Sequence, residues 1–140
     1  MSSESPSDST PEFFVDRSLG RHVVPEALRA AGLTVYSMAD VYGEQIGQGL
    51  EDEVWLRHAG ENDWVVLMKD AKIRYRPAEL RAVQHFGVRA FCLVSGNLRA
   101  DEQAARLVEN VPRIVRAAAK PGPYIFGVYA GQIRRLWPSD

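Results

Sequence analysis

Acidic residues stand where apolar runs end or where a helix should begin, and this pattern constrains the fold of the chain most. The apolar run 13–15 leads directly into Asp16, and the apolar run 64–68 is followed, after one lysine, by Asp70. Between them, the acidic residues 51–53 open an amphipathic segment. The carboxyl ends of parallel strands share one edge of an α/β sheet, and ligands bind in the crevice there. We therefore expect three carboxylates to converge at one sheet edge: Asp16, Asp52 and Asp70.

The chemistry of such a cluster points to a hard divalent cation. Carboxylate oxygens with few other reactive groups nearby form the site that Mg²⁺ or Mn²⁺ prefers. The histidines His22, His58 and His85 lack the spacing of a zinc motif, and the chain has no glycine-rich phosphate loop and a single cysteine. The pattern therefore favours metal-assisted hydrolysis of phosphodiester bonds.

Each acid also has a purely structural interpretation. Asp16 suits the N-cap of a helix, and Asp52 suits a first helical turn, where the helix dipole favours a negative charge. Glu51 or Glu53 could face the site in place of Asp52. An ion-paired turn would explain Asp70. The sequence leaves open whether these acids are metal ligands or caps.

The basic residues are concentrated in the second half of the chain. Residues 1–63 carry 12 acidic against 4 basic residues, a balance of −8, whereas residues 64–140 carry 6 against 13, a balance of +7. Such asymmetry can indicate contact with nucleic acid. Basic side chains alternate with a tyrosine after Asp70, as in grooves for single-stranded RNA, although a surface turn explains them nearly as well. We expect three of them to approach a phosphate: Lys72, Arg74 and Arg76.

Length and composition indicate one cytoplasmic domain. The 140 residues suffice for a single hydrophobic core. No apolar run approaches the ~20 residues that span a bilayer, so we expect no membrane contact. Residues 1–11 are rich in Ser, Pro and acid without the features of a secretion signal, and they are expected to form a disordered leader before a nuclease domain at 12–137.

Strand-like and helix-like segments alternate along the chain. This order predicts an α/β fold, a three-layer α/β/α sandwich around a mainly parallel sheet, with a C-terminal β-hairpin and a flexible loop at 39–50. The expected strands are 12–15, 33–38, 64–68, 88–95, 124–129 and 132–137. The expected helices are 19–31, 52–60, 77–86 and 99–119, the last kinked or divided at Pro112.

Four segments in this order resemble the PIN-like domain family, in particular the short VapC-type toxins of bacterial toxin–antitoxin pairs. The matching segments are 13–17, 27–33, 52–56 and 64–70. The resemblance extends over residues 12–137, and the PIN-like fold agrees with the α/β sandwich expected from the segment order.

The resemblance implies a Mg²⁺- or Mn²⁺-dependent endoribonuclease that acts on RNA, is inhibited by a cognate antitoxin protein and forms a homodimer. It makes Asp16, Asp52 and Asp70 the catalytic metal ligands. The fourth acid of the family has no clear match, since Asp101 and Glu102 are equally placed at the start of the long helix.

Two other functions remain compatible with the sequence. One is a catalytically weak PIN-like binding or regulatory module, whose acids serve as caps. The other is a flavodoxin-like or receiver-like signalling domain, which also gathers acids at strand ends. The absence of an adjacent acid pair after the first strand, together with the C-terminal hairpin, counts against the signalling domain.

Overall fold

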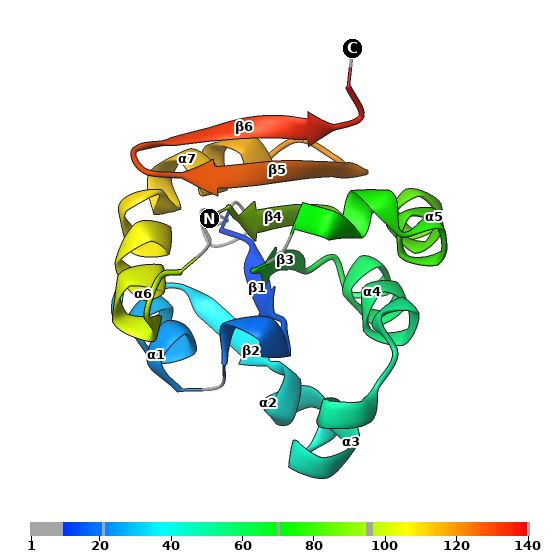
Figure 1. Ribbon diagram of the computed structural model, residues 1–140, viewed down its shortest axis with the longest axis horizontal. Coiled ribbons are helices and arrows are strands. Elements are labelled where there is room, and N and C mark those ends of the chain that lie inside the picture. The colour runs from blue at the N-terminus through cyan, green and yellow to red at the C-terminus, as the bar shows by residue number, and fades with distance from the viewer. Residues whose placement is uncertain (1–9, 21, 70, 95–96, 140) are drawn as a thin grey trace, which may run out of the picture.

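The computed structural model describes residues 10–20, 22–69, 71–94 and 97–139. Their centre is a six-stranded sheet in the order β2-β1-β3-β4-β5-β6 (Figure 1). The strands are β1 (Glu12–Val15), β2 (Thr34–Ser37), β3 (Val65–Met68), β4 (Arg89–Leu93), β5 (Tyr124–Tyr129) and β6 (Gln132–Trp137). The helices are η2 (Arg17–Leu19), α1 (Val23–Ala30), α2 (Met38–Tyr42), α3 (Glu44–Gly49), α4 (Asp52–Glu61), η3 (Ala71–Tyr75), α5 (Pro77–Phe86), α6 (Ala100–Glu109) and α7 (Val111–Ala118).

Five neighbouring strands run parallel, and the sixth closes the sheet as a hairpin. β1 pairs in parallel with β2 and β3, and β3, β4 and β5 continue the parallel order. β6 is antiparallel to β5. The predicted α/β class, the mainly parallel sheet and the C-terminal hairpin are confirmed.

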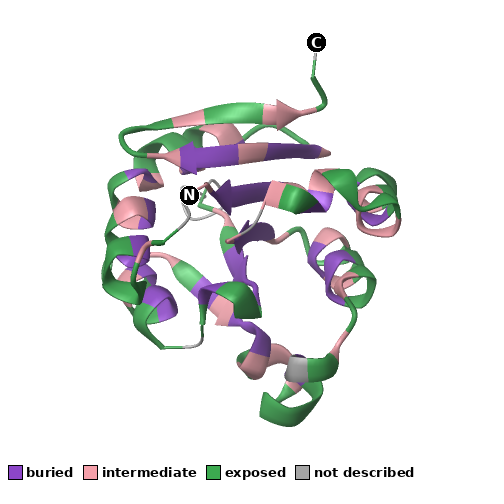
Figure 2. Ribbon diagram, viewed as in Figure 1, coloured by how far each residue is buried: buried purple, intermediate pink, exposed green. Residues whose placement is uncertain are grey.

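Helices cover both faces of the sheet and produce the three layers. In Figure 1, α1 and α6 lie on one side of the sheet, and α4 and α5 lie on the other. Strand β1 supplies both cores, because successive side chains point to opposite faces. Phe13 and Val15 join the core under α1, α6 and α7, whereas Phe14 joins the core under α4 and α5. Figure 2 shows the inner strands buried between the two helical layers.

The expected flexible loop at 39–50 is wrong, because this segment forms α2 and α3. Ser37 and Asp40 cap α2 reciprocally: the Ser37 hydroxyl accepts from the Asp40 N–H at 3.1 Å, and the Asp40 carboxylate accepts from the Ser37 N–H at 2.9 Å. A Cβ at Gly47 would lie 2.8 Å from Cγ of Met38. This glycine therefore permits close packing of α3 against α2, and flexibility does not explain its presence.

Two predicted helices have different bounds from those expected. The helix expected at 19–31 begins at Val23, and Leu19 belongs to η2 instead. The helix expected at 99–119 is divided at Asn110 into α6 and α7, as a proline in the first turn of α7 favours. The expected leader falls mostly on residues 1–9, which lie outside the described residues.

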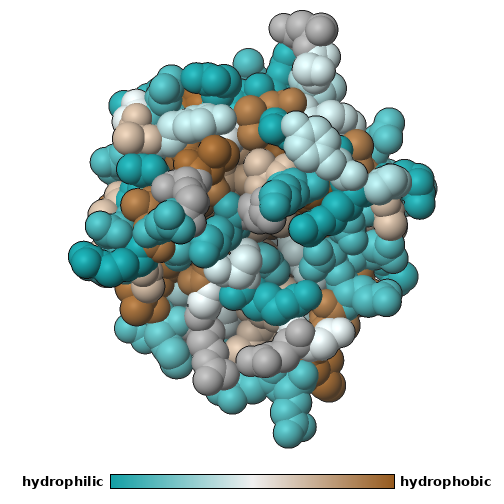
Figure 3. All heavy atoms as spheres, viewed as in Figure 1, coloured by the Kyte–Doolittle hydropathy of each residue, from teal (hydrophilic) through white to brown (hydrophobic). Residues whose placement is uncertain are grey.

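The surface view in Figure 3 shows a mostly hydrophilic face, with hydrophobic atoms in separate patches. Among the described residues, no helix combines the length and the hydropathy needed to cross a membrane.

Candidate active site

Asp16 lies at the carboxyl end of β1 and is almost completely buried, with 6% of its surface exposed. Its backbone N–H donates to the carbonyl of Leu67 at 3.0 Å, which continues the pairing of β1 with β3. One carboxylate oxygen, Oδ2, accepts from the hydroxyl of Ser18 at 2.6 Å and from the Ser18 N–H at 3.3 Å. The other oxygen, Oδ1, is buried without a hydrogen-bond partner among the described residues. The capping interpretation thus accounts for only half of this carboxylate.

Ser18 connects the ends of two neighbouring strands. While its hydroxyl donates to Asp16, the same oxygen accepts from the backbone N–H of Lys69 at 3.1 Å. Lys69 directly follows β3 and directly precedes Asp70 in the sequence. Asp70 itself lies outside the described residues, so its predicted place in the cluster stays a prediction.

Asp52 is the first residue of α4, and a residue of the hydrophobic core holds its carboxylate in place. The indole N–H of Trp55 donates to Oδ1 of Asp52 at 3.0 Å. The ring of Trp55 is fully buried and stacks on Phe14 of β1, with 5.4 Å between the ring centroids. Phe14 is two residues before Asp16, so one strand positions both acids. The neighbours Glu51 and Glu53 are exposed, whereas Asp52 is half-buried.

Asp52 is close enough to Asp16 to affect the pKa of its carboxyl group. Burial raises the pKa of Asp16 above its ordinary value, the hydrogen bonds from Ser18 lower it, and the negative charge of Asp52 raises it further. Arg17 supplies a weaker opposing effect and donates to Oδ1 of Asp52 at 3.4 Å. The pKa of Asp16 is raised overall, because the hydrogen bonds and the charge of Arg17 do not fully offset the cost of burying its negative charge.

A cavity of ≈ 270 Å³ opens beside Asp52 and is strongly acidic. Two of its lining residues were not expected from the sequence, namely Glu79 in the first turn of α5 and Arg17. Arg17 also donates to the carbonyl of Gly47 at 3.2 Å, which ties α3 to the site. The sequence did contain a signal for Glu79, because α4 and α5 both carry acidic residues in their first turns. The lining residues are Arg17, Glu51, Asp52, Glu53 and Glu79.

The two candidates for a fourth acid both interact with Arg99 at the start of α6, and only Glu102 belongs to the helix cap. Asp101 and Glu102 are exposed at the start of this helix. Arg99 donates to Asp101 at 3.3 Å, and this hydrogen bond lowers the pKa of Asp101. Glu102 accepts from the backbone N–H of Arg99 at 2.9 Å. Across the ranges that the structure describes, no three acidic, histidine or cysteine side chains form a ready metal cage.

The three predicted phosphate-binding residues belong to η3 or follow it directly. Lys72 and Arg76 are exposed, whereas Arg74 is half-buried. The guanidinium of Arg74 lies 4.7 Å from the ring centroid of Tyr75, and its Nε is buried without a hydrogen-bond partner among the described residues. Because η3 follows β3, these residues come after the same strand end as Lys69.

The fold and this site define a class of protein, an α/β/α sandwich with carboxylates at the carboxyl edge of its parallel sheet. Residues 11–95 match the sequence profile of a family described as "PIN like domain". A Mycobacterium tuberculosis protein named "Putative ribonuclease VapC45" is 40% identical over 123 residues, which cover 88% of this chain and 89% of that protein. The chain therefore belongs to the PIN-like domain family, in its VapC-type branch. No solved structure shows a significant match.

Proposed function

We propose that this chain is the toxin endoribonuclease of a toxin–antitoxin pair and hydrolyses RNA with the help of Mg²⁺ or Mn²⁺. We assign the metal to Asp16, Asp52 and Asp70, which are also the proposed catalytic residues. Membership of the VapC-type branch supports the reaction class. It also sets aside the flavodoxin-like or receiver-like alternative.

The observation that carries the metal proposal is Oδ1 of Asp16, which is buried without a hydrogen-bond partner among the residues that the structure describes. A buried carboxylate oxygen without a donor is costly, and a second negative charge at Asp52 adds to the cost. A divalent cation would compensate both charges and satisfy the free oxygen. Oxygen donors of this kind suit Mg²⁺ and Mn²⁺ better than softer metals.

A bound divalent ion would lower the pKa of a water molecule and stabilise charge on the phosphate. The protein residues contribute orientation. Ser18 holds one oxygen of Asp16 and leaves the other available, and Trp55 fixes the carboxylate of Asp52. We assign phosphate contact to Arg74, since a guanidinium can form two parallel hydrogen bonds with phosphate oxygens. Lys72 and Arg76 would add positive charge beside it.

We further propose that the antitoxin, or a second copy of the chain, covers exposed apolar residues on α3, α4 and η3. Ile46 of α3 is 65% exposed and Tyr75 of η3 is 70% exposed, while Val54 lies in the first turn of α4. Partner contacts form on exposed apolar surface, and these three side chains would supply it. The reaction and its inhibitor would then meet in the cytoplasm.

Cleavage of a fluorescent RNA by the purified chain tests the proposal. We expect turnover with Mg²⁺ or Mn²⁺, none with EDTA, and none for Asp16→Asn under either condition. Glu26→Gln removes the same charge from an exposed position on α1, across the sheet from α4, and serves as the matched control. Cleavage that persists equally in EDTA would contradict the metal assignment.

A second candidate is a binding module without catalysis. The observation in its favour is that Arg17 already donates to Asp52 and that Asp16 already caps η2. In that case RNA would bind but remain intact with either metal, and the melting temperature would not respond to the metal.

A further inference from the structure

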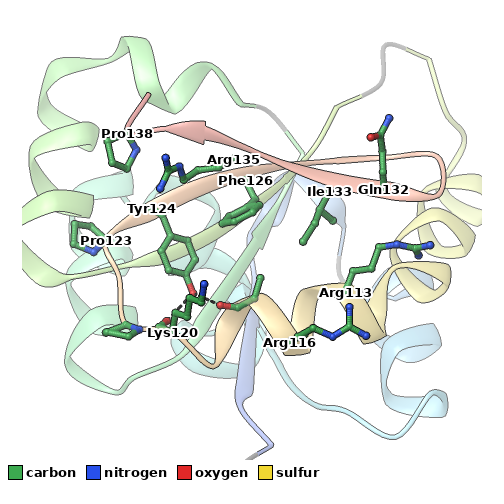
Figure 4. A pocket seen from close by; sticks show the side chains of 12 residues that line it. Arg113, Arg116, Lys120, Pro123, Tyr124, Phe126, Gln132, Ile133, Arg135 and Pro138 are labelled. Carbon is green, nitrogen blue, oxygen red and sulfur yellow. Dashed lines mark hydrogen bonds between the residues drawn. The ribbon is translucent and has the colours of Figure 1, made fainter. Parts of the chain in front are cut away.

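A second cavity lies at the other end of the sheet from the acidic site. It is a groove of ≈ 720 Å³ between α7 and the face of the β5–β6 hairpin (Figure 4). We call it the basic groove. Its charged lining residues are Arg113, Arg116, Lys120 and Arg135.

The positive charge of the basic groove follows from the sequence of its elements. Residues 111–139 carry five basic and no acidic residues. Arg113 and Arg116 are three residues apart on α7 and share one face of the helix, and Lys120 follows two residues after the helix ends. The helix is held against the sheet by its opposite side, where Ile114 and Ala118 are buried.

The floor of the basic groove is apolar and rigid. Phe126 and Ile133 are half-buried in it, and Phe126 stacks on Phe91 with 5.3 Å between ring centroids. The hydroxyl of Tyr124 donates to the carbonyls of Ala117 at 2.9 Å and Lys120 at 2.8 Å. These two hydrogen bonds, drawn in Figure 4, fix the end of α7 to the start of β5. The basic groove is therefore preformed.

The basic groove runs along the strands, from Tyr124 to Gln132, which pairs with Tyr129 at the end of β5. Near one end, the amide of Asn110 donates to the carbonyl of Tyr129, the last residue of β5, at 2.8 Å. At the other end, Lys120 contacts Tyr124, the first residue of β5. Because β5 and β1 point the same way, the Tyr129 end lies on the edge of Asp16. β5 is three strands from β1, or about 14 Å at ~4.8 Å per strand.

We propose that the basic groove binds single-stranded RNA and holds the part of the substrate that extends beyond the acidic site. This inference rests on the proposed ribonuclease function. The cavity beside Asp52 is lined by four carboxylates and one arginine, so it repels a polyanion, and the binding free energy must come from cations elsewhere.

Charge and shape both favour an RNA strand in the basic groove. Cations on two elements flank an apolar floor, which suits a strand whose phosphates face the rims and whose bases face the floor. From Arg113 to Ala118, the last residue of α7, the helix rises about 7.5 Å, at ~1.5 Å per residue. This is longer than the axial rise between successive phosphates of one strand, about 3.4 Å in a duplex.

RNA binding in EDTA tests the inference without requiring cleavage. The probe is a fluorescein-labelled oligouridine of about 12 nucleotides, and fluorescence anisotropy of the full chain gives its affinity. Arg116→Ala with Lys120→Ala should weaken binding about tenfold and lower the salt slope by about 1.4. Both residues are exposed, so the fold should persist. Lys120→Glu alone should act in the same direction.

The matched control is Arg57→Ala with Arg81→Ala. It removes the same charge from exposed positions on α4 and α5, across the sheet. We expect its affinity to stay within about twofold of the wild type. Equal losses in both double variants, or none in the first, would overturn the inference. An oligoglutamate peptide that displaces the RNA at equal charge would also overturn it and indicate an acidic protein partner.

Cleavage assays separate this inference from the proposed function. Arg116→Ala with Lys120→Ala should slow cleavage of the longer RNA but leave that of a tetranucleotide unchanged, because a short substrate cannot reach the basic groove. Wild-type protein that binds RNA through the basic groove but never cleaves it would refute only the proposed function. Cleavage of long RNA at the wild-type rate by the double variant would refute only the inference.

Discussion

The hydroxyl of Ser18 donates to Oδ2 of Asp16 at 2.6 Å, while Oδ1 of the same carboxylate stays buried without a partner among the described residues. One oxygen thus holds the chain in place, and the other is available for a ligand. The cap and the metal ligand, which were alternatives in the sequence, are compatible roles of one side chain. This division of the carboxylate suggests how its two roles can be tested separately.

The pKa of an aspartate in the unfolded chain is ~4, and that of Asp16 in the folded protein is higher. We expect the free energy of unfolding of the metal-free protein to decrease as the pH rises from the first of these values through the second. In this range the folded state binds the proton more tightly than the unfolded state, so raising the pH favours unfolding. Asp16→Asn should lack this contribution. The measurement is urea unfolding of both proteins across pH in EDTA. A difference between their unfolding free energies that is independent of pH would contradict the assignment.

Ser18→Ala should destabilise the protein by about 1–3 kcal/mol, because the Lys69 N–H and Oδ2 of Asp16 both lose a partner. It should also raise the pKa of Asp16, since the hydrogen bonds of Ser18 lower it. Chemical unfolding gives the first value, and the pH dependence of unfolding gives the second. Thr10→Ala, which removes a hydroxyl from an exposed residue before β1, is the control.

Asp52→Asn should lower the affinity for divalent metal about tenfold or more, and it should also lower the pKa of Asp16. The asparagine keeps an oxygen for the indole N–H of Trp55, so the fold should remain intact. Titration of Mn²⁺ followed by thermal melting measures the affinity. Glu53→Gln changes the net charge equally at an exposed site. A similar loss in both variants would show that only net charge matters.

Arg74→Ala should leave the metal-induced melting shift intact but weaken RNA binding and cleavage. Arg74→Lys should restore salt-dependent binding better than turnover, because an ammonium cannot reproduce two parallel hydrogen bonds. Steady-state cleavage over a range of salt measures both effects. If Arg74→Ala cleaves RNA at the wild-type rate throughout, the phosphate contact must be sought at Lys72 or Arg76.

Asn110→Ala should cost about 1–3 kcal/mol of unfolding free energy without a change in metal affinity. Asn110 is fully buried, and its amide donates to the carbonyls of Arg106 at 2.9 Å and Tyr129 at 2.8 Å. Removing it leaves the last carbonyl of β5 without this donor. Urea unfolding and a Mn²⁺ titration of the same variant check both statements. An unchanged stability would mean that water replaces the amide.

The sequence alone predicted the six strands, the mainly parallel sheet and the C-terminal hairpin. Apolar runs such as 64–68 are long enough for a strand and too uniform for a surface helix, and β3 is indeed buried along its whole length. The proline at position 77 and the division near Pro112 follow from local backbone chemistry. The family resemblance, confirmed by the match over 11–95, rests on the same local motifs.

Local patterns were misleading where packing decides the conformation. The glycines at 43, 47 and 49 indicated a flexible loop, yet Gly47 is required because Met38 leaves no room for a Cβ. The choice of Asp52 among three adjacent acids depends on the indole of Trp55, whose own position depends on Phe14 in another element.

Only the tertiary structure brought distant charges together. Glu79 reaches the cavity of Asp52 because α4 and α5 pack side by side, and Arg135 joins the cations of α7 because the hairpin folds over that helix. Periodicity reports which side of an element is buried, but it carries no information about which other element lies opposite. The position of Asp16 at the end of β1 was therefore predictable from the sequence, whereas the basic groove was not.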